Sequence, residues 1–456
     1  MGLVRSLSIG TSSLIAHQKR MDVISNNLAN ANTIGYKSSR MTFAEQFSQT
    51  YRHGTGPSSN TQNGIGGVDP LQYGLGVKVG STQMNMGQGI IESTDRPLDM
   101  AINGSGFFIY NDNGTQKYSR AGAVKQDREG YLVDSNSGAF LSGYNVQTDS
   151  TGKANKTDAG DNILDKKISN IRIKPSTISL PKQTTNIEMN GNLDSAMKTT
   201  DLPRPTTVKI FDQNGAAHDL TINISKAAAP NQFTLSGSID GKTVTLSATT
   251  IEFNPEGTLK TPLNLTVTAA NLNTALGNSA FNSTAPKNLD IRLADPNNLT
   301  SGSMTQFAGA TTATIASQDG YQAGNLLSTE VDSTGKILGS FSNGKTEVLA
   351  QAVLANFVNP EGLLKQGGNF YIGSPNSGEA IYGNAVENFA STRVIGRSLE
   401  QSNVEMTEQF TDMISTQRAY EAASRTITVS DQMPVSYTHL RAHETKANLV
   451  CRLLLE

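Results

Sequence analysis

Residues 3–30 read LVRSLSIGTSSLIAHQKRMDVISNNLAN, and this stretch decides how the N-terminal end of the chain folds. Its recurring apolar positions are Leu7, Leu14, Met21 and Leu28, with Ile24 beside them. A seven-residue apolar repeat is the spacing of a coiled-coil seam, so the stretch predicts an amphipathic helix. Because one helix cannot bury its own apolar stripe, we expect it to pack against a partner.

The far end of the chain carries a second seven-residue repeat. Its members are Leu399, Met406, Met413, Tyr420 and Ile427, and Phe410 and Ile414 widen the stripe. Ser402 followed by Glu405 matches a capping box, in which two side chains satisfy the first free amides of a helix. We therefore expect this helix to begin near Val404 and to pack against the N-terminal helix.

The two repeats have a second interpretation, in which each is an ordinary amphipathic helix lying on a globular core. Isolated helices are marginal in water and gain most of their stability from packing. Two such helices at opposite ends of one chain therefore favour contacts with each other and with neighbouring chains. Assembly would then be coupled to folding.

The composition of the chain limits the kinds of partner it can have. The 456 residues carry a net charge of only -2, so no basic field attracts nucleic acid or an anionic membrane surface. No stretch reaches the roughly 20 apolar residues that span a bilayer, and polar residues interrupt the N-terminus. Neither membrane insertion nor a cleaved signal peptide is predicted. Cys451 is the only cysteine, which excludes a disulfide within the chain.

The interior of the chain is predicted to be rich in β-strands. Its many glycines, threonines and asparagines favour short strands joined by tight turns. Phe107–Tyr110 ahead of an Asn-rich turn predicts a strand, and Asn214-Gly215 and Asp240-Gly241 each lie between alternating apolar runs, as in β-hairpins. The passage 266–285 is weakly patterned and fits either a loop or an edge strand.

Both ends of the chain also carry recognisable motifs. They are AHQKRMDVISNNLANANTIGYK (16–37), LDMAINGSGFF (98–108), YSRAG (118–122), LANFVNPEGL (354–363), SLEQSNV (398–404) and QRAY (417–420). These segments resemble the flagellar axial protein family, which contains the rod, hook and hook-associated subunits. The resemblance covers the two ends, and the middle of the chain follows only by analogy to a variable outer domain.

The resemblance implies a multidomain fold with α-helical coiled-coil termini and mainly-β inserted domains in a nested, discontinuous arrangement. The expected parts are paired terminal helices at 1–45 and 386–433, a connector at 46–75, a first β-domain at 76–150 and 301–385, and an outer β-domain at 151–300. At Pro434 the sequence departs from the family pattern. Because proline lacks the helical N–H and clashes with the preceding turn, we expect the helix to stop there. Residues 434–456 are then a tail outside the family pattern.

The asparagines near the end of the first helix are further candidate site residues. The amides of Asn26, Asn27 and Asn30 can end the helix as turn residues or bond to a neighbouring subunit, and the sequence leaves both interpretations open. Gly35 can take the left-handed conformation that often follows a helix. The predicted assembly interface consists of Leu7, Leu14, Met21, Ile24, Leu28, Asn26, Asn27, Asn30, Leu399, Met406, Phe410, Met413, Tyr420 and Ile427.

The sequence predicts neither catalysis nor metal binding. It contains no Walker loop, no Cys-x-x-Cys pair and no His-Glu-x-x-His run, and its histidines are scattered. Ser105 lies between two glycines but lacks the Gly-x-Ser-x-Gly spacing of a nucleophile elbow. We therefore expect no enzyme activity, no cofactor and no metal.

The function implied by the resemblance is that of a structural subunit of the bacterial flagellar hook. Such a subunit is exported without a cleaved signal peptide and polymerises outside the cell into a curved, flexible tube that transmits torque from the rod to the filament. Its expected partners are other copies of the chain, the rod, the hook cap, the hook–filament junction proteins and the flagellar export apparatus. A distal rod subunit shares the end motifs but is expected to lack the large insertion. A surface adhesin or binding module, and after it a secreted hydrolase, are alternatives from other classes.

Overall fold

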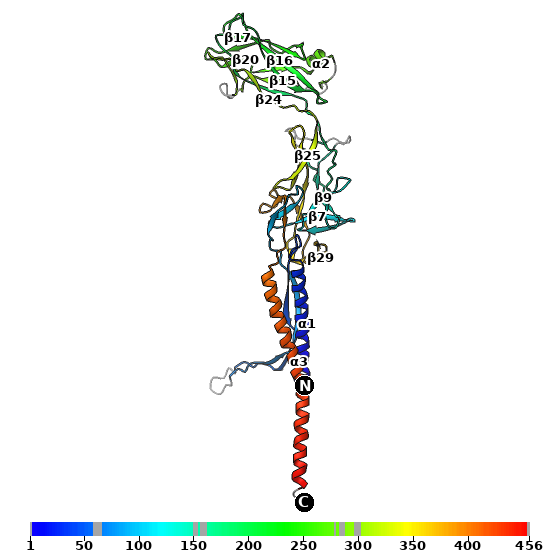
Figure 1. Ribbon diagram of the computed structural model, residues 1–456. Helices are drawn as coiled ribbons and strands as arrows, with labels where there is room; N and C mark the ends of the chain where they lie inside the picture. The colour runs from blue at the N-terminus through cyan, green and yellow to red at the C-terminus, as the bar shows by residue number, and fades with distance from the viewer. Residues whose placement is uncertain are drawn as a thin grey trace. The chain divides into compact units, whose positions relative to one another are not determined.

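The computed structural model describes residues 2–57, 66–148, 154–155, 162–277, 280–281, 288–295 and 302–453, and these are mainly β-strands with a long helix at each end of the chain (Figure 1). Two compact units divide the chain. The first comprises Met1–Ile173, Glu330–Leu338 and Val348–Glu456, and the second comprises Lys174–Thr329 and Gly339–Glu347. The chain passes between the units after Ile173 and within the strands β25 (Gly324–Val331), β26 (Lys336–Phe341) and β27 (Thr346–Ala352).

The unit boundaries differ from the predicted domain boundaries at three places. Residues up to Ile173 lie in the first unit, although the outer β-domain was expected to start at 151. Residues 301–329 lie in the second unit rather than the first β-domain, and so do Gly339–Glu347. Strand pairing explains the second difference. The strand β14 (Asn186–Asn192) pairs with β24 (Thr314–Gln318), so the segment after 301 completes the sheets of the second unit.

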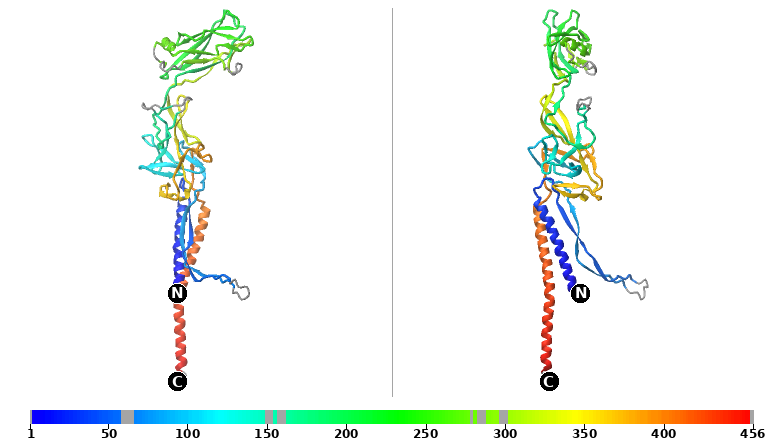
Figure 2. Two further views of the ribbon diagram at one scale, coloured as in Figure 1. Left: turned by 180° about the vertical axis from the view of Figure 1, so that it is seen from behind. Right: turned by 90° about the vertical axis from the view of Figure 1, so that its right-hand side faces the viewer.

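The helices of the first unit are α1 (Gly2–Ala29), α3 (Met406–Leu453) and a short 3-10 turn at Pro360–Gly362. Figure 2 shows α1 lying alongside α3 in both views. The predicted helix stop at Pro434 is wrong, because α3 continues to Leu453. An interior proline removes one backbone hydrogen bond at a cost of about 3 kcal/mol, and the helix is continuous on both sides of it.

The strands nearest the helices form two antiparallel pairs. The strand β1 (Ser39–Glu45) pairs with β4 (Val77–Met84), and β2 (Ser48–Arg52) pairs with β3 (Leu71–Gly74). The predicted connector at 46–75 therefore contains paired strands at its described ends, where Thr50 lies opposite Gln72 and the register shifts between Thr50 and Arg52. Residues 1–45 were assigned to the terminal helical part, and the last part of this range is β1.

The remaining strands of the first unit build its β body. They are β5 (Ile91–Ser93), β6 (Met100–Asn103), β7 (Phe107–Asp112), β8 (Thr115–Ser119), β9 (Val124–Gln126), β10 (Leu132–Asp134), β11 (Phe140–Asn145), β12 (Ser169–Asn170), β28 (Leu354–Asn356), β29 (Leu364–Gly367), β30 (Phe370–Ile372), β31 (Ile381–Gly383), β32 (Arg393–Gly396) and β33 (Ser398–Glu400). The path β27-β11-β7-β8-β30-β29 forms the main sheet, while β32 pairs with β6 and β33 with β5. The strand and turn predicted from Phe107 are confirmed by the β7–β8 hairpin. The buried Phe107, Phe357 and Tyr371 pack edge to face in its core.

The second unit has two sheets that share one apolar core. Its elements are β13 (Ile178–Ser179), β14, β15 (Arg204–Phe211), β16 (Ala217–Lys226), β17 (Gln232–Ile239), β18 (Lys242–Val244), β19 (Thr250–Phe253), β20 (Leu259–Thr261), β21 (Asn264–Val267), α2 (Ala269–Leu276), β22 (Leu289–Arg292), β23 (Met304–Thr305) and β24. One sheet has the order β15-β16-β17-β19-β20 with β18 beside β17, and the other has the order β21-β22-β14-β23 with β24 beside β14. The core includes Phe233, Phe253 and Leu272.

Both hairpins predicted in the second unit are confirmed. The strands β15 and β16 pair across the Asn214-Gly215 turn, and β17 and β18 pair across Asp240-Gly241. The weakly patterned passage contains the helix α2, which the sequence analysis missed. The Thr268 side chain accepts from the amide of Asn271 at its start, and Gly277 caps its end.

Candidate assembly surface

The helices α1 and α3 run antiparallel and contact each other through polar groups along their shared length. Ser6 Oγ lies 3.2 Å from Ser430 Oγ near one end, and Arg20 pairs with Asp412 at 3.3 Å further along. As the residue number rises on α1 it falls on α3, which defines the antiparallel direction. The sequence correctly placed these two helices together.

The α3 residues that are buried in the single chain form a line along the helix, and this line is offset by three residues from the predicted apolar stripe. Its members are Gln409, Thr416, Ala423 and Ser430, which are small or polar and recur every seven residues. The predicted Met413, Tyr420 and Ile427 flank this line and are half-buried, and Met406 is exposed. Small side chains let the two backbones approach closely, as Gly10 of α1 shows: a Cβ atom there would lie 2.7 Å from Ile427 Cγ1.

The predicted α1 stripe lies beside a buried line as well. Leu7, Leu14, Met21 and Leu28 are half-buried, whereas Gly10, Ala16 and Ile24 are buried. Of the apolar positions predicted on α1, only Ile24 is fully inside the single chain. The other four keep part of their apolar surface available to a neighbour.

Leu399 does not belong to α3, which corrects its place in the predicted heptad stripe. It is buried in β33, opposite Glu92 of β5. The predicted capping box is also absent, because Ser402 Oγ accepts from the amide of Val404, 3.3 Å away, rather than from that of Glu405. The helix consequently begins at Met406, two residues later than expected. Leu399 was included in the predicted repeat only because of its seven-residue spacing. In the structure it pairs with β5 as part of a strand instead.

The outer side of α3 presents an apolar stripe to solvent. Met406 is 48% exposed, Phe410 48% and Ile414 52%, and their four-residue spacing puts them on one face. On α1, Ile9 and Ile15 are also exposed. Large apolar side chains clustered on a surface mark interaction sites. The sequence analysis expected Phe410 and Ile414 to widen the helix–helix seam, but within one chain they face away from it.

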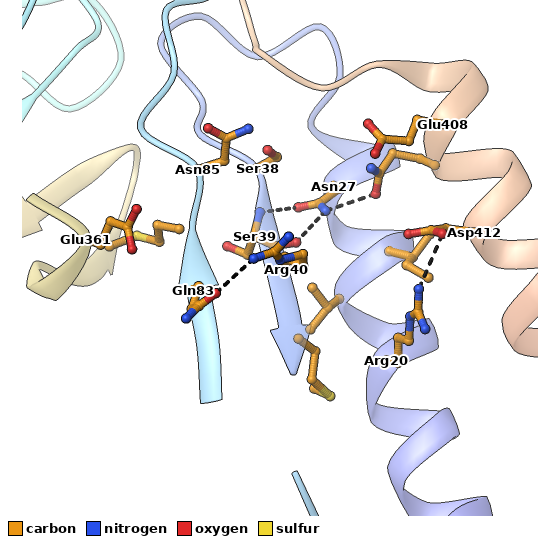
Figure 3. Close-up of a pocket in the computed structure, with 15 residues that line it drawn as sticks. Arg20, Asn27, Ser38, Ser39, Arg40, Gln83, Asn85, Glu361, Glu408 and Asp412 are labelled. Atoms are coloured by element: carbon orange, nitrogen blue, oxygen red, sulfur yellow. Dashed lines mark hydrogen bonds and ion pairs between the residues drawn. The ribbon is translucent and has the colours of Figure 1, made fainter. Parts of the chain in front are cut away.

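The side-chain amide of Asn27 joins α1 to β1 and to α3 through four hydrogen bonds, two donated and two accepted. Its Nδ2 donates to the carbonyl of Ser39 at 2.8 Å and to Gln409 Oε1 at 3.0 Å. Its Oδ1 accepts from the amide of Ser39 at 3.0 Å and from the hydroxyl of Tyr36 at 3.2 Å. Figure 3 shows the bonds of Asn27 to Ser39, between α1 and β1. Asn27 is almost fully buried, so its bonds lie within the chain.

The other two candidate asparagines act locally. Asn30 Nδ2 donates to the carbonyl of Asn26 at 2.8 Å and to Asn26 Oδ1 at 3.0 Å, and Asn30 Oδ1 accepts from the hydroxyl of Thr33 at 3.1 Å. This is turn chemistry at the end of a helix, one of the two interpretations that the sequence left open. Gly35 follows in the expected left-handed conformation, with φ at +69°.

A polar cavity of about 350 Å³ lies beside Asn27. Residues of α1, β1, β4, α3 and the Pro360–Gly362 turn line it (Figure 3). The Arg20–Asp412 ion pair closes one side, and Arg40, which donates to Gln83 Oε1 at 3.1 Å, closes another. Its lining mixes charges of both signs, which does not single out one class of small ligand.

The sequence analysis missed a buried charge cluster at the end of the helix pair that adjoins the β body. Lys37 Nζ lies 2.6 Å from Glu400 Oε1, and Arg120 Nη1 lies 3.3 Å from Glu400 Oε2. Burial lowers the pKa of the Lys37 ammonium below its ordinary value, and the charge of Glu400 opposes that shift. Each residue belongs to a family motif quoted from the sequence. Membership in these motifs was the available signal, but nothing local indicated that the three side chains meet.

The part of the chain that the structure describes holds no group of three or more His, Cys, Asp or Glu side chains arranged to bind a metal ion. Among the described helices, none is long and apolar enough to cross a membrane.

Comparison with known proteins connects these surfaces to one family. Four family profiles match: the flagella basal body rod protein at residues 7–37, the flagellar hook protein FlgE/F/G D1 domain at 101–192, the flagellar basal body protein FlaE D2 domain at 183–321, and the flagellar basal body rod FlgEFG protein C-terminal at 396–433. The last match ends one residue before Pro434, where the sequence analysis placed the departure from the family pattern.

Relatives match nearly the whole chain. The flagellar hook protein FlgE of Borreliella burgdorferi is 32% identical over 94% of this chain and 98% of its own length. That of Escherichia coli is 32% identical over 96% of this chain and 100% of its own length. The crystal structure of the Helicobacter pylori flagellar hook protein FlgE2 superimposes on 68% of this chain and 100% of its own, with a TM-score of 0.48 and 14% identity. On the identity and coverage of the first two relatives, this chain belongs to the flagellar hook protein family.

Proposed function

We propose that the chain is a structural subunit of the bacterial flagellar hook, which polymerises through its terminal helices into a tube that transmits torque. It is not an enzyme in this proposal, and it acts outside the cell at the hook and basal body. The observation that carries the proposal is the exposed apolar stripe of Met406, Phe410 and Ile414 on α3. A single chain leaves this stripe in water, and a neighbouring copy would cover it.

An open helical array requires two different patches on each subunit, because each copy contacts its neighbours head to tail. The α3 stripe supplies one patch, and Ile9 and Ile15 offer two further exposed apolar contacts, which point about 120° apart around α1. Under this proposal the α1–α3 pair acts as a coiled coil in the assembled tube, and the second unit is a nested β insertion in the chain. Further partners would be the rod, hook-cap and hook–filament junction proteins and the export apparatus.

The double variant Phe410→Ser/Ile414→Ser tests the proposal. Full burial of each side chain is worth about 1.5–3 kcal/mol, and roughly half of that remains to be gained on assembly. We expect the critical concentration for polymerisation, measured by sedimentation, to rise at least about tenfold. The fold of the single chain should not change, because both side chains already face solvent.

The matched control is Leu202→Ser, which removes a still more exposed apolar side chain from the second unit. This variant should polymerise like the unaltered chain. Unchanged polymerisation of the α3 double variant, or an equal loss in the control, would contradict the proposal.

A further inference from the structure

The buried charges of Lys37, Arg120 and Glu400 lie where the two helices meet the β body. Lys37 follows the end of α1, Glu400 ends β33 ahead of α3, and Arg120 follows β8. The side chains of Lys37 and Glu400 are fully buried, and that of Arg120 is only 5% exposed. Three segments that are distant in sequence are thus joined by charge at a buried site.

The remaining bonds of the cluster all go to backbone groups. Glu400 Oε1 also accepts from the amide of Gly89 at 2.9 Å, and Lys37 Nζ donates to the carbonyl of Gly87 at 2.7 Å. Arg120 Nη2 donates to the carbonyl of Gly104 at 2.8 Å. Two cations face one carboxylate, so these carbonyl dipoles stabilise the excess positive charge.

The backbone around the cluster ties the end of α1 to the start of α3. The amide of Gly35 donates to the carbonyl of Glu400 at 2.7 Å, and the amide of Ser38 donates to Asn403 Oδ1 at 2.8 Å. Asn403 Nδ2 in turn donates to the carbonyl of Asn85 at 2.8 Å. The segments leaving and entering the helices therefore form one polar junction.

The apolar core of the neighbouring β body reaches the charge cluster, because the Arg120 guanidinium lies 5.4 Å from the centroid of the Phe107 ring. That core also contains Ile109, Tyr118 and Tyr371, and none of its described residues belongs to α1 or α3. A buried charge network is sensitive to the loss of any one member, because removing it leaves the others buried and unpaired.

We infer that Lys37, Arg120 and Glu400 form a charge lock that couples the helix pair to the β body. Opening the lock releases α1, α3 and the segments that join them as one unit, while the β body stays folded. The lock goes beyond the subunit role proposed above, because it concerns how one chain holds its own helices, and it can be tested without polymerisation.

The test is hydrogen–deuterium exchange of the full chain carrying Glu400→Gln. This substitution keeps the shape of the side chain but removes the negative charge that Lys37 and Arg120 share. We expect amides at 33–38, 87–91 and 398–403, and those of α1 and the first turns of α3, to exchange at least about tenfold faster than in the unaltered chain. Amides of β7 and β11 should keep their exchange rates.

Asp134→Asn is the matched control, since it neutralises another buried carboxylate of the same unit. Asp134 bonds only to its own turn, accepting from the amide of Ser137 at 2.8 Å. This variant should leave the junction amides protected. Equal acceleration of the junction in both variants would overturn the lock, as would an unaltered chain whose junction amides are unprotected.

Lys37→Met covers the case in which Glu400→Gln does not fold. It leaves the oppositely charged pair of Glu400 and Arg120 in place, so the chain should fold and show a smaller but equally selective acceleration. A Lys37→Met chain that loses protection across β7 and β11 as well would show that the cluster stabilises the whole unit, which contradicts a selective lock.

Discussion

Gly35 determines the direction in which the chain leaves α1. Its φ of +69° lies in the region that favours glycine, and an added Cβ would lie 2.6 Å from the backbone nitrogen of Ala121. The same residue donates its amide to Glu400. A side chain at this position would therefore strain its own backbone and separate α1 from the β body.

Gly35→Ala should lower the free energy of unfolding of the first unit by about 3 kcal/mol, from backbone strain and the clash together. Urea denaturation followed by circular dichroism measures the loss. Gly114→Ala is the control, because Gly114 also has a positive φ of +84° but an added Cβ meets nothing within 4 Å. It should lose only about 1 kcal/mol. Equal losses would show that the close approach to Ala121 is unimportant.

Asn27 allows a second test among individual residues. Asn27→Ala leaves Gln409 Oε1 and the backbone groups of Ser39 without their partner, and each buried unpaired group costs about 1–3 kcal/mol. We expect a loss of about 3 kcal/mol in the same denaturation experiment. Asn26→Ala, at an exposed position one residue earlier, should change stability by less than about 0.5 kcal/mol. A mild effect at Asn27 would mean that water replaces its bonds.

Sequence reasoning reached part of this detail. The left-handed Gly35 followed from glycine chemistry, and turn bonding at Asn26 and Asn30 was one of two open interpretations. The partners of Asn27 and the lock of Lys37, Arg120 and Glu400 did not follow. Lys37 and Glu400 are 363 positions apart, and no local pattern pairs residues across such a separation.

Among the elements, a helix was correctly predicted at each end of the chain, and the residues of α3 that are buried in the single chain lie three positions from the predicted stripe. The sequence analysis assigned the largest apolar residues to the seam because burial of apolar surface usually dominates packing. The observed seam instead uses Gln409, Thr416, Ala423 and Ser430, which permit close approach and pair with Asn27 and Ser6. The bulky residues are left at its margins, where a neighbouring subunit can cover them.

The close approach of the helices predicts the effect of Gly10→Val. The new side chain would collide with Ile427, since even a Cβ atom lies 2.7 Å from its Cγ1. Overpacking of this kind costs about 1–3 kcal/mol, and we expect the helical signal at 222 nm to be lost at correspondingly lower urea concentration. Ser8→Val places the same side chain on an exposed position of α1 as a control. Identical unfolding of both variants would contradict the close seam.

Across the whole molecule, the β-rich interior was predictable because turn chemistry marks hairpins directly. The sheet that joins β14 to β22 and β23 in parallel was not, because those pairings connect strands about 100 residues apart without a local turn. The same non-local pairing moved residues 301–329 into the second unit. The predicted domain boundaries, which rested on local sequence, therefore missed the segments that strand pairing assigns to the second unit.

Two units with separate cores should unfold separately. Phe233 is fully buried in the core of the second unit, and Phe233→Ala should destabilise that unit by about 3–5 kcal/mol. Differential scanning calorimetry should show one transition at a lower temperature and the other unchanged. Phe107→Ala, in the core of the first unit, should move the other transition. If each variant lowers both transitions equally, the chain unfolds as one cooperative body.

The most direct measurement is electron microscopy of the purified full chain under polymerising conditions, beside a chain that lacks residues 1–30. Without its N-terminal segment the chain loses α1, and with it the partner that packs against α3 and the exposed side chains of Ile9 and Ile15. The account predicts tubes from the full chain and none from the shortened one. Normal tubes from the shortened chain would contradict assembly through the terminal helices.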